Sequence, residues 1–110
     1  MAITSTPEPS HNDARMVQVQ QEVVIAAEQS AGDYSLFGHL MHLSLELAAN
    51  GEFDQALWVA DEMIALAQGR PSLRSPRTRR YRGLGKRVIS IALGAKEQIV
   101  EIRKETEAKS

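Results

Sequence analysis

The sequence contains no cysteine, so disulfide bonds, thiolate metal sites and cysteine nucleophiles are all excluded. The same absence favours a reducing compartment, and we expect a cytoplasmic protein. Its apolar runs are far shorter than the roughly 18 residues that a membrane span requires, so we expect no membrane anchor. Residues 1–10 contain neither a basic residue nor an apolar run, and we expect no signal or transit peptide there.

The motifs of common catalytic sites are also missing. Residues 83–86 read Gly-Leu-Gly-Lys, but no predicted strand precedes them and their spacing is not that of a phosphate-binding loop. No nucleophile elbow is present. The adjacent acids Asp61 and Glu62 would lie on different faces of a helix, which is typical of an ordinary surface. We therefore expect a protein that is not an enzyme and needs no cofactor.

Helical periodicity dominates the sequence that remains. Hydrophobic residues recur every three or four positions in segments 12–30, 33–49 and 53–67. A fourth helix starts either at Ser75 or near Lys86. The choice is open because Gly83 and Gly85 lie between these positions, and each glycine weakens a helix by about 1 kcal/mol. The residues expected to face the core are Met16, Val19, Val23, Ala26, Ala27, Leu36, Phe37, Leu40, Met41, Leu43, Leu47, Ala48, Phe53, Ala56, Leu57, Ala60, Met63, Ile64, Ala67, Val88, Ile91, Ala95, Ile99 and Ile102. The predicted fold class is all-α, a small bundle of about four helices with a long C-terminal helix.

The length of the chain and its connections indicate a single helical domain over residues 12–107. Residues 1–11 are expected to form a flexible leader and residues 108–110 a frayed tail. Asp33 is a candidate N-cap of the second helix, because its carboxylate can accept the free amides of the first turn. The pair Asn50-Gly51 suits the left-handed backbone at a helix end, so the second and third helices should form an antiparallel hairpin.

Residues 40–57 contain the run Leu-x-x-Leu-Ser-x-x-Leu-Ala-x-x-Gly-Glu-Phe-Asp-Gln-Ala-Leu, in which Gly51 and Ala56 would let two helices approach closely. In these positions segment 37–70 resembles one tetratricopeptide repeat, which implies a helix–turn–helix unit. Three positions depart from the family pattern: Ser44, Leu47 and Gln68, where the family usually has glycine, an aromatic residue and proline. No second copy is present, and about three repeats are needed for a stable array. The resemblance therefore implies a hairpin and gives only slight support to peptide binding.

Charge is distributed very unevenly, although the net charge is −1. Residues 1–69 contain ten acidic residues and a single basic residue, Arg15, whereas residues 70–87 contain eight basic residues and no acidic one. Seven of the eight are arginine, whose planar guanidinium binds phosphate or carboxylate through two N–H groups and stacks on flat rings. We call residues 70–87 the Arg-rich segment.

The Arg-rich segment predicts contact with nucleic acid, within a nucleoprotein assembly. On a helix its central arginines would point in several directions, so they cannot all face the bundle. Arginine can neutralise phosphates, and an aromatic side chain can stack on a base. The candidate residues for this contact are Arg74, Arg77, Arg79, Arg80, Tyr81, Arg82, Lys86 and Arg87. Two alternatives are a solvated basic loop that the acidic helices of the same molecule partly neutralise, and contact with a protein partner that has an acidic patch.

A second functional hypothesis is a small regulator or inhibitor that docks on a protein partner. The acidic helices could occupy a basic cleft by imitating nucleic acid. Trp58 falls outside the predicted inner stripe of its helix, and a half-exposed tryptophan is common at interfaces; it could equally pack on the first helix. The candidate residues for this interface are Asp54, Trp58, Asp61 and Glu62. The two hypotheses place the binding surface in oppositely charged parts of the chain.

His39, His42 and Glu46 share one side of the second predicted helix, as helical metal ligands would. The same face continues through Ser35 and Asn50 and lies opposite the leucines. The polar face of an amphipathic helix explains this pattern without a metal. We therefore expect no metal site.

Overall fold

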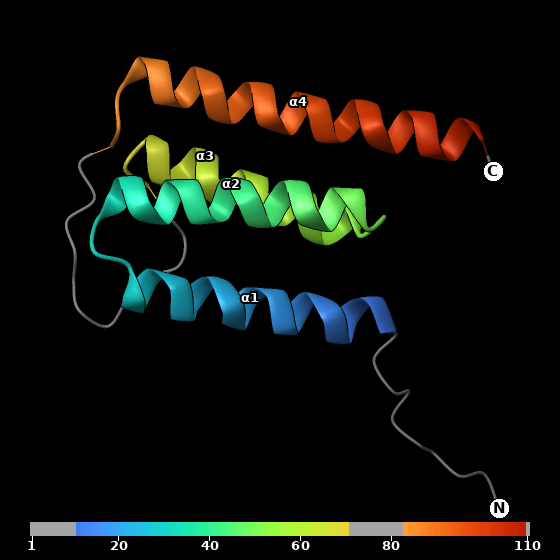
Figure 1. The fold of residues 1–110 in the computed structure, drawn as a ribbon, viewed down its shortest axis with the longest axis horizontal. Helices are drawn as coiled ribbons and strands as arrows, with labels where there is room; N and C mark the ends of the chain where they lie inside the picture. Colours follow the sequence, from blue (N-terminus) through green and yellow to red (C-terminus); the bar gives the residue numbers. More distant parts are fainter. Residues whose placement is uncertain (1–10, 71–82, 110) are drawn as a thin grey trace, which may run out of the picture.

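Four α-helices run up and down in sequence order (Figure 1). The structure, a computed structural model, describes residues 11–70 and 83–109. Helix α1 spans His11–Gln29, α2 Asp33–Ala49, α3 Phe53–Ala67 and α4 Lys86–Ala108. Within the described ranges there is no strand, and α4 is the longest helix with 23 residues. The predicted all-α bundle is confirmed. Among the described residues, no helix has the length and the apolar composition needed to cross a membrane.

Helices α2 and α3 form the predicted antiparallel hairpin. The backbone N–H of Glu52 donates to the carbonyl of Leu47 at 2.9 Å, and that of Gly51 donates to Ala48 at 3.1 Å. Gly51 has a φ of +79°, a conformation that is easily adopted only by glycine. These contacts close the C-terminus of α2 and turn the chain directly into α3.

The start of α2 differs from the sequence prediction, and the start of α4 decides between two predicted positions. Asp33 is the first residue of α2 and not its N-cap; Gly32 takes the N-cap position in an extended conformation, without a side chain to cap the helix. Helix α4 begins at Lys86, the later of the two predicted starts. The predicted leader lies outside the described residues except for His11, which belongs to α1.

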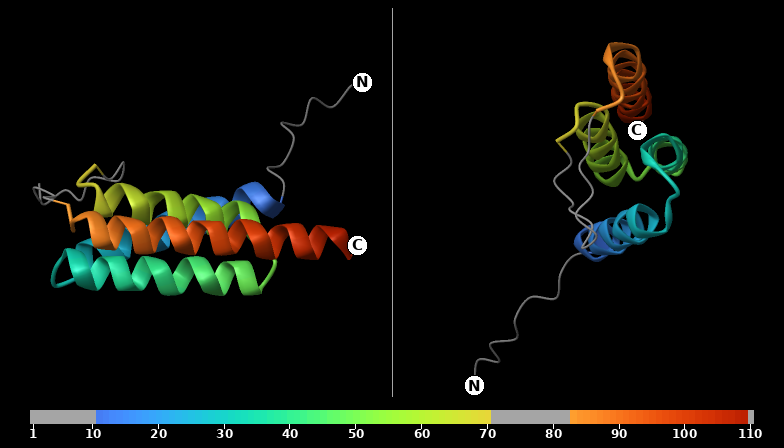
Figure 2. Two further views of the ribbon diagram at one scale, coloured as in Figure 1. Left: turned by 90° about the horizontal axis from the view of Figure 1, so that it is seen from above. Right: turned by 90° about the vertical axis from the view of Figure 1, so that its left-hand side faces the viewer.

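Helix α3 is the central element of the bundle. It contacts α1, α2 and α4, whereas α1 and α4 lie on opposite sides of the hairpin (Figure 2). Because it is covered from several directions, α3 buries much more than the single predicted stripe. Its buried residues are Gln55, Ala56, Val59, Ala60, Glu62, Met63, Leu66 and Ala67. Small residues at Ala56, Ala60 and Ala67 allow the neighbouring helices to approach closely.

The predicted core is mostly confirmed in α1 and α2 but was wrong at one position of α4. Val19 and Val23 of α1 and Leu40 of α2 are buried, as expected. In α4, Ile91 is 49% exposed, while the next residue, Ala92, is completely buried. Apolar residues cover more than half of the circumference of α4, so periodicity alone does not fix which part of that arc faces the hairpin.

Candidate binding sites

The two ends of the Arg-rich segment are held together at one end of the bundle. The N–H of Leu84 donates to the carbonyl of Ala67 at 2.8 Å, which joins the start of α4 to the end of α3. Gly83 has a φ of +80°, and a Cβ placed there would lie 3.1 Å from the carbonyl oxygen of Ala67. Arg70 is exposed directly after α3. The N–H of Arg70 donates to the carbonyl of Ala65 at 2.7 Å, so the two described ends of the segment lie beside the same end of α3.

Changing Gly83 to Ala is expected to lower the free energy of unfolding by about 1–3 kcal/mol, because the substitution combines left-handed strain with a close contact. Changing Gly94 to Ala is the matched control: this glycine lies inside α4 with no atom within 4 Å of an added Cβ. There the same chemical change should stabilise by about 0.5–1 kcal/mol. Urea denaturation followed by circular dichroism measures both, and two shifts of the same sign would contradict the described turn.

The start of α4 is strongly positive. Its first turn contains no acidic residue and begins with Lys86 and Arg87, both exposed. Gly85 at the N-cap offers no side chain to accept the free amide hydrogens, which carry the positive end of the helix dipole. Within the described part of the chain, neither Lys86, Arg87 nor Arg70 takes part in an ion pair. This arrangement favours an anion.

Most of the predicted nucleic-acid contacts lie outside the described residues: Arg74, Arg77, Arg79, Arg80, Tyr81 and Arg82. Only Lys86 and Arg87 of that set can be placed. The described structure therefore gives the position of both ends of the Arg-rich segment, and the prediction for its centre stays a prediction.

The acidic residues predicted as a protein interface make contacts within the fold. Asp61 accepts from Nζ of Lys96 at 2.7 Å, and Oδ1 of Asp54 accepts from Nη1 of Arg103 at 3.3 Å. Both pairs join α3 to α4 and are half-exposed, so each stabilises the fold only slightly. Glu62, expected on the surface, is 8% exposed, which corrects that prediction.

Trp58 of the same predicted set is half-buried and packs against the core. The two alternatives for this residue, an interface side chain or a packed one, are not mutually exclusive at this degree of burial. Its ring contributes to the bundle whether or not a partner covers the remainder.

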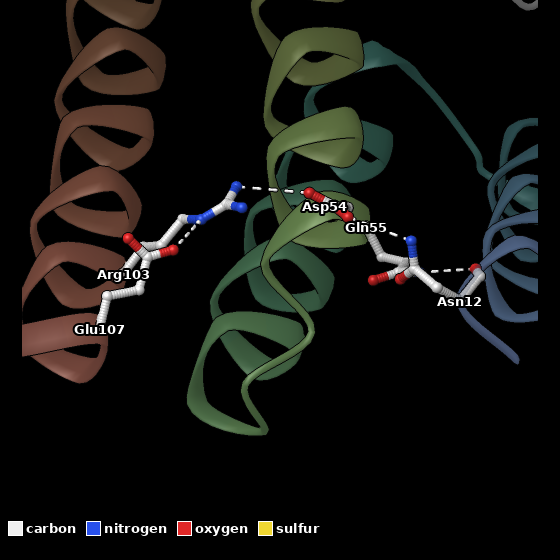
Figure 3. Close-up of polar contacts among 5 residues, drawn as sticks. All are labelled: Asn12, Asp54, Gln55, Arg103 and Glu107. Atoms are coloured by element: carbon white, nitrogen blue, oxygen red, sulfur yellow. Dashed lines mark hydrogen bonds and ion pairs between the residues drawn. The ribbon is translucent and has the colours of Figure 1, made fainter. Parts of the chain in front are cut away.

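A polar network fixes the opposite end of the bundle (Figure 3). Nε2 of the buried Gln55 donates to the backbone oxygen of Asn12 at 3.0 Å and to its Oδ1 at 2.7 Å. Nδ2 of Asn12 in turn donates to Asp54 at 3.1 Å, and Arg103 joins Asp54 to Glu107. The hydrogen bond to Glu107 raises the pKa of Arg103 above its usual value, with a smaller contribution from Asp54. The network connects α1, α3 and α4 through mutually satisfied groups, which is a structural role.

Arg15 forms a separate link between α1 and the hairpin. Its Nε donates to Oε1 of Glu52 at 2.7 Å, and its Nη2 donates to Oε2 at 3.5 Å. This hydrogen bond raises the pKa of Arg15; partial desolvation opposes the rise, and the charges of Glu22 and Glu46 add to it. The only basic residue of the first 69 is thus bound by a carboxylate of its own chain.

A groove of about 370 Å³ lies between α1 and α2. Its lining residues are Arg15, Glu22, Ile25, Ala26, Gln29, His39, His42, Leu43, Glu46, Leu47 and Asn50. The polar stripe of His39, His42 and Glu46 therefore forms one wall of this groove. Nε2 of His42 lies 3.4 Å from Oε2 of Glu46. In the described ranges no group of three or more histidine or acidic side chains is placed to hold a metal ion.

Sequence reasoning found one wall of the groove but not the groove itself. Glu22 on the opposite wall and the neighbouring Ile25 belong to no sequence motif, and only the packing of α1 beside α2 brings them close to the histidines. Ile25 is 50% exposed, an unusual position for a large aliphatic side chain in an otherwise amphipathic helix.

Comparison of the chain with protein-family models, with curated proteins and with solved structures finds no match. The resemblance of segment 37–70 to a tetratricopeptide repeat stays a prediction, although the hairpin that it implies is present.

Proposed function

We propose that this protein acts by binding, without catalysis, and that its Arg-rich segment contacts the phosphate backbone of nucleic acid. The observation that carries the proposal is the position of the segment's two ends. Eight basic residues and no acidic one fall between Arg70 and Arg87, and the Leu84–Ala67 hydrogen bond confines both ends to one end of the bundle. A concentrated positive surface of this kind attracts a polyanion over a distance of about one Debye length.

Internal ion pairs support this proposal over the alternative. Three of the carboxylates that could neutralise the Arg-rich segment already have other partners. Asp54, Asp61 and Glu52 pair with cations outside the segment, namely Arg103, Lys96 and Arg15. The same pairs remove support from docking through the acidic residues of α3, because Asp54 and Asp61 already have partners in the fold and Glu62 is buried.

The arginine content favours a backbone contact with a contribution from stacking. Guanidinium groups bind phosphate oxygens through two N–H groups and stack on bases. Both contacts are independent of the nucleotide sequence. The first turn of α4 adds backbone N–H groups without a side-chain cap, next to the exposed side chains of Lys86 and Arg87. We therefore expect affinity that depends on salt more than on nucleotide sequence.

Reversing two charges at each end of α4 tests the proposal. The variant Lys86→Glu with Arg87→Glu should bind labelled single-stranded RNA at least about tenfold more weakly in fluorescence anisotropy, because two phosphate contacts are replaced by repulsion. Its fold should survive, since acidic residues suit a helix N-terminus. The matched control is Lys104→Glu with Lys109→Glu, the same change of charge in exposed residues at the other end of the helix.

The control variant should retain affinity within about twofold at 150 mM salt, since its charges lie beyond the screening length from Lys86 and Arg87 at the start of α4. Equal losses in the two variants would show a dependence on net charge alone and contradict a local site. Failure of the wild-type protein to bind either RNA or DNA at low salt would also overturn the proposal.

A further inference from the structure

The groove between α1 and α2 has an apolar floor and charged walls. Ile25 and Ala26 of α1 and Leu43 and Leu47 of α2 supply the aliphatic lining, with Ile25 half-exposed to solvent. Lining residues extend from Arg15 to Gln29 along α1, which at 1.5 Å per residue is about 21 Å. The groove is thus long in relation to its volume of about 370 Å³, and it is shallow.

The charge of the groove is acidic. Glu22 stands on the α1 wall and Glu46 on the α2 wall. The only lysine or arginine in the lining is Arg15, and Glu52, which is not part of the lining, binds its guanidinium at 2.7 Å. In the described part of the chain, Glu22 forms no ion pair, and Glu46 has only the imidazole of His42 at 3.4 Å. Two carboxylates, one on each wall, are therefore left for a cation.

We propose that this groove binds one face of a basic amphipathic helix from a partner protein. A helix of about 14 residues matches the length of the walls, and its row of apolar side chains at i, i+3 or i+4, and i+7 would fill a shallow apolar floor. Lysine or arginine side chains flanking that row reach Glu22 on one side and Glu46 on the other. None of the residues that line the groove belongs to the Arg-rich segment, so the proposed peptide and a polyanion would contact different residues.

The lining fits a helix better than a small molecule. Small-molecule sites are concave and enclose most of the ligand, with a few buried polar groups that fix its orientation. The polar groups here are exposed: the side chain of His42 is 82% exposed and that of Glu46 is 59% exposed. Exposed charges on the two sides of an apolar strip are typical of the rim of a protein interface.

A designed peptide tests the proposal with the full-length protein. The probe is a helical peptide of about 15 residues with leucine on one face and lysine on both flanks, and its twin has glutamate in place of every lysine. In ¹⁵N-labelled protein, the lysine peptide should shift the amide signals of Glu22, Ile25, Gln29, His39 and Leu43. The glutamate twin should bind at least about tenfold more weakly, since it places like charges on both walls.

Charge reversal in the groove should invert this preference. The variant Glu22→Lys with Glu46→Lys should bind the glutamate twin better than the lysine peptide. The matched control is Glu97→Lys with Glu105→Lys, the same change of charge at two exposed positions of α4 that are not in the groove. The control should keep the wild-type preference. Ile25→Ser gives an uncharged second variant: it removes half-exposed apolar surface, so the fold should survive while affinity for the lysine peptide falls.

Several results would overturn the proposal. These are shifts that map outside the groove, equal binding of the two peptides, no saturable binding of the lysine peptide, and an unchanged preference in the folded groove variant. Failure of this proposal can be distinguished from failure of the proposed function. The groove variants should keep nucleic-acid binding, and the variant Lys86→Glu with Arg87→Glu should keep peptide binding.

Discussion

Replacing Arg77, Arg79, Arg80 and Arg82 together with glutamate is expected to abolish salt-sensitive binding to nucleic acid. Each phosphate that a basic side chain neutralises releases condensed counterions, so four contacts give a slope of about −4 in log K against log salt on duplex DNA. Their loss, with four repulsive charges in their place, should weaken binding at low salt by about a thousandfold or more. Anisotropy titrations from low to moderate salt measure both the affinity and the slope.

Reversal of the acidic residues on α3 separates this result from the regulator hypothesis. Asp54→Lys with Asp61→Lys would face Arg103 and Lys96 with like charges, so we expect a lower melting temperature and no loss of nucleic-acid affinity. The opposite pattern would favour the regulator: wild-type protein without salt-sensitive binding to any nucleic acid, and a protein partner lost on reversal of the acids.

Changing Leu47 to Ala is expected to produce the largest loss of stability from a single substitution. Its side chain is 1% exposed and lies where α2 packs beside α1, and a cavity left there costs about 2–5 kcal/mol. Domains of this size have a total stability of about 5–15 kcal/mol, so the variant should be close to unfolding. Thermal and urea denaturation followed by circular dichroism measure the change.

Leu93→Ala is the control for that variant, because it makes the same chemical change at a leucine that is 51% exposed. Its free energy of unfolding should change by about 0.5 kcal/mol or less. Similar losses at Leu47 and Leu93 would mean that the described orientation of α2 or of α4 is not the one present in solution.

Local features of the sequence were sufficient to predict the helices and their order. The leucines at 36, 40, 43 and 47 recur at the helical period, and Asn50-Gly51 ends that pattern with residues that stop a helix. Residues close in sequence determine both features, so no knowledge of the tertiary structure was needed. The same applies to the hairpin, because a connection of three residues between two helices leaves little alternative to an antiparallel pair.

Position in the bundle explains where the sequence interpretation failed. Glu62 and Gln55 are polar residues on α3, which packs against α1, α2 and α4, and both are buried although their types are usually exposed. Ile91 is exposed because α4 is apolar over an arc wider than the surface that the hairpin offers it. A single-helix pattern contains no information on how many neighbours a helix has.

The candidate sites divide in the same way. The Arg-rich segment was visible in the sequence because charge is a property of residue types and needs no packing to appear. The acidic groove was not visible, because Glu22 and Glu46 lie on different helices and become a pair of walls only when α1 packs beside α2.

The sequence by itself determined the helical class, the central hairpin and the separation of acidic from basic residues, since propensity, turn chemistry and charge act within a few neighbouring residues. Only the tertiary structure decided which acidic residues form ion pairs with α4, which arc of α4 is buried, and that a groove lies between α1 and α2. Those outcomes depend on contacts between residues about 15 to 50 positions apart, whose geometry is set by the packing of whole helices against one another.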